Sequence, residues 1–207
     1  MRDIPNILLL LLVSAPLLNG CGATADPALP LENSGSTDDG RCQISVPRFE
    51  ERTIPVGASQ TRAKIWSPEG DADAGIIFVS GVDGGFVEPV DQIYTRMGER
   101  FAARGVPSVF VRYRSPGELT PSVQDALAAA EVLRQRGVRK MAIAGWSFGG
   151  AVIVHSAVRI PEVVTVVGFA PQARDTEAVA QFKNQSILLM HSETDENVPY
   201  ISSQQIL

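Results

Sequence analysis

The chain has 207 residues, of which 44% are hydrophobic and 20% are charged. This balance is ordinary for a globular protein and far from the compositions that remain disordered, and the length favours one domain. The formal net charge is -5, so the sequence provides no basic stripe with which to neutralise nucleic-acid phosphates. We therefore expect a small-molecule partner and no nucleic acid.

The first twenty residues are typical of an export signal. One basic residue, Arg2, precedes the apolar run Ile7–Val13, which is too short to span a bilayer as a helix. The segment Leu18–Cys21 resembles the lipobox of bacterial lipoproteins, in which the cysteine after the cleaved bond is diacylated on sulfur. The resemblance implies lipidation of Cys21 and a lipid anchor in the bacterial cell envelope, on the periplasmic or outer-membrane face. The alternatives are an ordinary cleaved signal peptide and a short hydrophobic anchor.

The segment that follows the signal has the composition of a linker. Turn-forming and acidic residues without an apolar period predict a flexible tether over residues 21–41, followed by a folded domain over 42–207. Cys42 is expected to be a partly buried, inert thiol in a first strand. Strand-like patterns at 52–56 and 63–66 predict short antiparallel strands at a sheet edge.

Short apolar runs alternate with longer amphipathic stretches from Gly75 onward. One amphipathic stretch extends from Val90 to Phe101, and the next is predicted to open with Thr120 as its N-cap and Pro121 after it. Such an alternation predicts a mostly parallel sheet with helices on both faces. The predicted strands are 76–79, 109–111, 141–144, 163–167 and 187–190.

The sequence Gly145–Gly150 (Gly-Trp-Ser-Phe-Gly-Gly) lies between a predicted strand and an apolar helix. A G-x-S-x-G pattern at such a turn predicts a nucleophile elbow, in which small residues permit a strained backbone that exposes the hydroxyl of Ser147. The N–H of Phe148 would lie at a helix N-terminus, where an oxyanion is favoured. The alternative interpretation is a glycine-rich turn in a non-catalytic α/β fold.

A second glycine-rich loop, Ser80–Gly85, follows the first buried strand. It resembles the oxyanion loop of α/β hydrolases, with Ser80 at the usual histidine position. The resemblance implies that the N–H of Val82 is the second oxyanion donor. The alternative is a plain glycine loop, and Asp83 is expected to be a solvated turn carboxylate.

The last buried run is followed by the loop His191–Pro199. This loop resembles the one that carries the triad acid in dienelactone-hydrolase-like and prolyl-oligopeptidase-like enzymes, and the resemblance implies that Asp195 is the acid. The order of serine before aspartate agrees with the superfamily. Glu193 and Glu196 are alternatives.

The chain contains two histidines, and neither suits the role of general base. His155 follows Ser147 by eight residues on the same predicted helix, roughly 12 Å along its axis. His191 precedes the acid, whereas the superfamily places its base after it. We therefore expect the final strand and the histidine-bearing loop of the fold to be missing from this chain. No metal or cofactor is expected, because no ligand cluster or nucleotide fingerprint occurs.

Together these features predict a serine hydrolase of the α/β-hydrolase type that cleaves a carboxylic ester or related acyl bond through an acyl-enzyme and is inactive as this fragment. A prolyl-oligopeptidase-type peptidase is disfavoured, because its propeller domain does not fit in this length. The alternative function is that of a non-catalytic surface lipoprotein that uses the fold for binding.

Overall fold

The computed structural model describes residues 48–207. The predicted signal peptide, the tether, the lipidation site Cys21 and the thiol of Cys42 lie outside these residues, and the predicted domain start at residue 42 stays a prediction. In the described part of the chain, no helix has the length and apolar character needed to cross a membrane.

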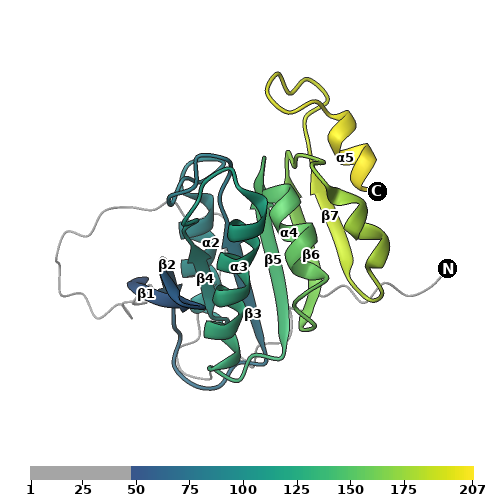
Figure 1. Cartoon of the computed structure of the whole chain (residues 1–207). Helices are drawn as coiled ribbons and strands as arrows, with labels where there is room; N and C mark the ends of the chain where they lie inside the picture. The colour runs from purple at the N-terminus through teal and green to yellow at the C-terminus, as the bar shows by residue number, and fades with distance from the viewer. Residues whose placement is uncertain (1–47) are drawn as a thin grey trace, which may run out of the picture. The chain divides into compact units, whose positions relative to one another are not determined.

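Residues 48–207 form one seven-stranded sheet with helices packed on it (Figure 1). The strands are β1 (Glu50–Val56), β2 (Ser59–Trp66), β3 (Ala74–Val79), β4 (Ser108–Val111), β5 (Lys140–Trp146), β6 (Val163–Phe169) and β7 (Ser186–Met190). The helices are α2 (Ile93–Ala102), α3 (Leu119–Arg134), α4 (Gly149–Ala157), the 3-10 helix η1 (Thr176–Gln181) and α5 (Ile201–Ile206).

The strand order is β1-β2-β4-β3-β5-β6-β7. The first two strands pair antiparallel with each other, and β2 pairs antiparallel with β4. From β4 to β7 all neighbours are parallel. The predicted mostly parallel sheet with an antiparallel edge is therefore confirmed, and each of the five apolar runs lies in a strand.

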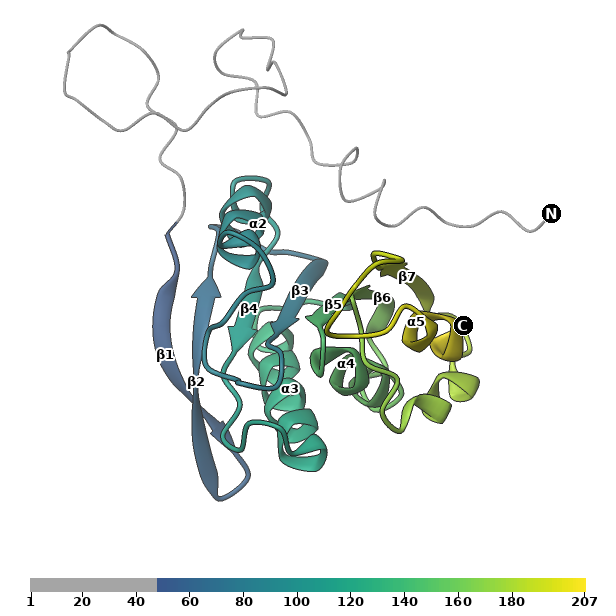
Figure 2. The same cartoon turned by 90° about the horizontal axis from the view of Figure 1, so that it is seen from above.

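Helices cover both faces of the sheet, as Figure 2 shows for α2 on one side and for α3 and α4 on the other. Side chains of β3 alternate between these layers: Ile77 packs in the core beneath α3 and α4, whereas Ile76 and Phe78 pack in the core beneath α2. Because successive strand side chains point to opposite faces, a strand buried on both faces must be apolar throughout. This explains the unbroken apolar runs of the sequence.

The start of α3 differs from the prediction. The helix begins at Leu119 with Glu118 as its N-cap, so Thr120 is not the cap. Pro121 is tolerated because it lies in the first turn, where a backbone N–H has no partner within the helix. The amphipathic character expected of this stretch is confirmed, because Val123 and Leu133 are buried.

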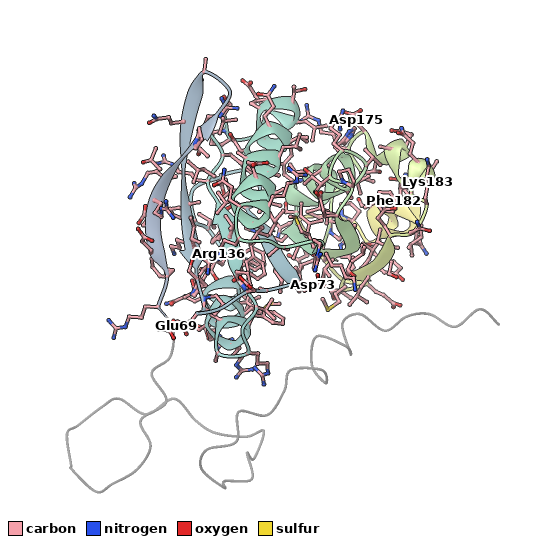
Figure 3. The ribbon with its side chains drawn as sticks, turned by 90° about the horizontal axis from the view of Figure 1, so that it is seen from below. Glu69, Asp73, Arg136, Asp175, Phe182 and Lys183 are labelled. Carbon is pink, nitrogen blue, oxygen red and sulfur yellow. The ribbon has the colours of Figure 1, made fainter. Side chains whose placement is uncertain are left out.

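The edge of the sheet at the N-terminal ends of the parallel strands carries polar contacts, and Figure 3 labels Asp73 and Arg136 there. The guanidinium of Arg139 donates to Asp73 over 3.0 Å, and that of Arg136 donates to the carbonyl of Pro68 over 2.8 Å. The candidate site lies at the other edge, where the carboxyl ends of the strands meet.

Candidate active site

Ser147 lies in the tight turn between β5 and α4. Its φ of +51° is in the left-handed region, which residues with a side chain rarely adopt. Three backbone hydrogen bonds fix this conformation. The N–H of Ser147 donates to the carbonyl of Phe169 (3.1 Å), and the N–H groups of Gln172 (2.9 Å) and Gly150 (2.8 Å) donate to the carbonyl of Ser147. The strained turn expected of a nucleophile elbow is therefore present.

The glycines around Ser147 allow β3, β5 and α4 to approach closely. A Cβ atom added to Gly145 would lie 2.6 Å from the carbonyl oxygen of Gly149, and one added to Gly149 would lie 2.6 Å from the carbonyl oxygen of Ser80. Both contacts are with backbone atoms, which cannot rotate away as a side chain can. These positions therefore need glycine.

The two predicted oxyanion donors, the N–H groups of Phe148 and Val82, lie on neighbouring loops. Phe148 is the N-cap residue of α4, and its side chain is buried. Within residues 48–207 neither N–H donates a hydrogen bond. Gly81 packs on the indole of Trp146, since a Cβ at Gly81 would lie 2.9 Å from that ring.

Asp195 occupies the loop after β7. Its Oδ1 accepts hydrogen bonds from the N–H groups of Asn197 and Val198, each over 2.9 Å. These bonds lower the pKa of Asp195, because they stabilise the charged carboxylate. The group therefore stays ionised at neutral pH, and its Oδ2 makes no hydrogen bond to another described residue.

Several of the predicted site residues line one depression, which has a volume of about 700 Å³. It is lined by Val82, Asp83, Pro89, Val90, Ile93, Trp146, Ser147, Phe169, Ala170, Met190, His191, Ser192, Asp195, Asn197 and Val198. Three of the predicted site residues, Ser147, Val82 and Asp195, thus share one surface, whereas Glu193 and Glu196 are exposed and do not line it. Asp83 is exposed, as expected of a solvated carboxylate.

Exposed apolar side chains form part of the lining of this depression. Val90 is 63% exposed and Met190 is 43% exposed, and both are among the lining residues. Exposed apolar side chains gathered around a concave surface are typical of a ligand-binding site.

His191 is engaged within its own loop. Nε2 lies 2.8 Å from the carbonyl oxygen of Val198, and Nδ1 lies 2.8 Å from the hydroxyl of Ser203. Because a carbonyl only accepts, Nε2 is the donor to Val198, and Nδ1 shares a hydrogen bond with the hydroxyl of Ser203. Both ring nitrogens are thus occupied, and neither is available to take a proton from Ser147.

His155 is also directed elsewhere. Its Nε2 contacts the carbonyl oxygen of Asp175, a residue labelled in Figure 3. His155 does not line the depression. The sequence-based interpretation of both histidines as poor general bases agrees with these contacts.

Sequence reasoning missed Gln172, whose Nε2 lies 3.4 Å from the hydroxyl oxygen of Ser147. Gln172 follows β6, the strand next to β5, on the loop at the carboxyl edge of the sheet. A signal was present, because residues that follow neighbouring parallel strands meet at this edge.

The sheet topology and the elbow define the α/β-hydrolase fold. The dienelactone hydrolase family model matches residues 76–207, more than half of the chain, and the chain therefore belongs to the dienelactone hydrolase family. No curated protein sequence matches the chain.

Solved structures with this fold include peptidases and esterases. The chain resembles the Pyrococcus horikoshii acylaminoacyl peptidase with 17% identity and a TM-score of 0.59, over 77% of this chain and 34% of that one. A serine hydrolase without a lid from Xanthomonas campestris matches with 19% identity and a TM-score of 0.57, over 76% and 77%. The Pyrococcus furiosus esterase Pf2001 matches with 13% identity and a TM-score of 0.63, over 77% and 76%. The chain thus spans about a third of the peptidase's length.

Proposed function

We propose that the chain carries the nucleophile, the triad acid and the oxyanion donors of a serine hydrolase that cleaves a carboxylic ester or related acyl bond. The observation that carries this proposal is the strained Ser147 in a depression that Val82 and Asp195 also line. The family and the fold support a hydrolase.

In the proposed mechanism, Oγ of Ser147 bonds to the carbonyl carbon of the ester while its proton passes to a histidine. The carbonyl oxygen becomes an oxyanion that accepts hydrogen bonds from the N–H groups of Phe148 and Val82. As the tetrahedral intermediate collapses, the bond to the alkoxy oxygen breaks, and the histidine returns the proton to the leaving alcohol. Water then cleaves the acyl-enzyme by the same steps in reverse order.

The base in this proposal is a histidine from outside residues 1–207. The chain has two histidines, and the ring nitrogens of both are engaged in other contacts. Oδ2 of Asp195 makes no hydrogen bond within residues 48–207 and lies 3.7 Å from Nε2 of His191. It is the atom that would accept a hydrogen bond from the incoming imidazole and stabilise its charged form. The isolated 207-residue chain would then be nearly inactive, because triad residues act as a unit.

The test uses the intact protein, including whatever its gene encodes after Leu207. We expect it to hydrolyse p-nitrophenyl butyrate and to react with a fluorophosphonate. Ser147→Ala is expected to abolish labelling and to lower kcat by about 10⁶-fold. Ser192→Ala is the matched control, because this serine lines the same depression and has no role in the proposal.

Full turnover by the Ser147→Ala protein would refute the assignment of the nucleophile. A folded wild-type protein that neither turns over esters nor reacts would favour the alternative, a binding protein that uses the same depression without chemistry.

For the N-terminal segment we propose lipidation of Cys21, which would tether the hydrolase to the bacterial cell envelope. The support is the sequence alone: the apolar run, the lipobox-like residues before Cys21 and the linker composition after it. Metabolic labelling with a fatty-acid probe is expected to mark the wild-type protein and not Cys21→Ser. A wild-type protein released soluble and unlabelled would refute this proposal.

A further inference from the structure

Tyr113 lies after β4 and contacts the residues around both proposed oxyanion donors. Its hydroxyl donates a hydrogen bond to the carbonyl oxygen of Ser80 over 2.9 Å. Its ring packs edge-to-face on Phe148, with centroids 6.0 Å apart and an interplanar angle of 88°. The side chain is buried, at 1% exposure.

The backbone on either side of Tyr113 is held in place. The N–H of Arg112 donates to the carbonyl of Arg62 on β2 over 2.9 Å. The N–H of Arg114 donates to the carboxylate of Asp125 on α3 over 2.8 Å, and the Arg114 guanidinium pairs with the same carboxylate. Asp125 has no exposed side-chain surface. Through Arg112 and Arg114, the backbone that carries Tyr113 is therefore attached to both β2 and α3.

The Ser80 carbonyl is close to the proposed hole. Because the peptide bond is planar, the direction of the Ser80 carbonyl fixes the direction of the Gly81 N–H in the same peptide. Only the two backbone angles of Gly81 then separate this anchored peptide from the N–H of Val82, the proposed donor. The hydroxyl of Ser80 lies 3.2 Å from the carbonyl oxygens of both Gly85 and Val87 farther along the loop. The loop thus closes on itself through Ser80 and is attached to the sheet by Tyr113.

We propose that Tyr113 is a positioning residue that holds the N–H groups of Val82 and Phe148 in the geometry that receives the oxyanion. The role rests on the proposed function. Burial raises the pKa of the Tyr113 phenol well above its ordinary value, so the hydroxyl remains a donor at any pH at which the protein would work.

The chain contains a matched control for the loss of this hydroxyl. Tyr94 is as buried as Tyr113, but among the described residues its hydroxyl has no hydrogen-bond partner. Tyr113→Phe and Tyr94→Phe therefore remove the same atom from equally buried rings, and only the first breaks a contact with the oxyanion loop.

In the intact protein, Tyr113→Phe is expected to lower kcat for p-nitrophenyl butyrate by about tenfold or more, since oxyanion donors act mainly in the transition state. KM should change less than about twofold, and Tyr94→Phe should leave both constants unchanged. Replacement of Tyr113 with 4-aminophenylalanine, which keeps a donor at the para position, is expected to restore most of the kcat. A merely structural role would not separate kcat from KM in this way.

Binding of butylboronic acid gives a second readout. The oxygen of Ser147 bonds to boron, its proton passes to the base, and the tetrahedral boronate anion presents an oxygen to the hole. Tyr113→Phe is expected to weaken this binding by about the same factor as kcat, because the adduct resembles the transition state. Equal kcat and equal boronate affinity in Tyr113→Phe and wild type would overturn the role of Tyr113 alone. An inactive wild type, or a fully active Ser147→Ala, would overturn the hydrolase proposal and this inference with it.

Discussion

Replacing Gly145 with alanine perturbs the elbow through one added methyl group. The new Cβ would lie 2.6 Å from the carbonyl oxygen of Gly149 and 2.8 Å from methyl groups of Ile153 and Val79. Nonbonded heavy atoms prefer about 3.5 Å, so the first turn of α4 would have to retreat by roughly 1 Å. That turn adjoins Ser147 and Phe148, so the shift would displace the proposed nucleophile and one proposed oxyanion donor together.

The expected cost has two parts. Overpacking a buried site destabilises by about 1–3 kcal/mol, which in a domain of this size lowers Tm by about 2–12 °C. A misplacement of about 1 Å at a catalytic group lowers the rate by about 10²-fold. Calorimetry and p-nitrophenyl butyrate turnover by the intact Gly145→Ala protein measure the two parts separately.

Gly75→Ala provides the control at the far end of β3. Its added Cβ would meet only side-chain methyl groups, of Leu133 at 3.1 Å and Val138 at 3.2 Å, which can shift. We expect less than about 1 kcal/mol of destabilisation and unchanged turnover. If Gly145→Ala behaved like Gly75→Ala in both assays, the close approach of β5 and α4 would not be what requires glycine at the elbow.

Three other predictions follow from the contacts described. Hydrogen bonds from Arg134, both 2.8 Å, lower the pKa of Glu162, so their stabilisation is present above the ordinary glutamate pKa and is lost as the pH falls through the lowered value. Since about 1 kcal/mol is lost at pH 7, Glu162→Gln should lower Tm there by about 2–4 °C in thermal melts, and this deficit should shrink as the pH falls through the lowered pKa of Glu162. A deficit that stayed equal at acidic pH would contradict the ionic origin. Asp195→Asn keeps an oxygen for the two loop N–H groups, so we expect normal Tm and a kcat about 10⁴-fold lower in the intact protein, and retained activity would exclude Asp195 as the acid. His155→Ala should leave ester turnover unchanged, because this side chain contacts Asp175 and does not line the depression. A large loss of kcat would make His155 a candidate for the general base again.

The sequence alone determined the sheet and the elbow, because each depends on local patterns. A strand buried on both faces must be apolar throughout, so the runs at 76–79 and 141–144 identified β3 and β5. The glycines at 145, 149 and 150 leave no room for a Cβ atom, and this pattern around Ser147 made the strained turn predictable. Because strands and helices alternate along the chain, the sheet was expected to be parallel, and the loops that follow its strands were expected to meet at one edge.

Only the tertiary structure decided the contacts that join distant segments. Tyr113 and Ser80 are 33 residues apart. No local pattern distinguishes Tyr113, whose hydroxyl makes a hydrogen bond, from Tyr94, whose hydroxyl makes none among the described residues. The ring of His191 could have faced Ser147, but the loop after β7 folds back so that Val198 and Ser203 contact both of its nitrogens. Side-chain partners of this kind depend on how helices and loops pack against the sheet, a property of the whole fold that periodicity and turn chemistry do not encode.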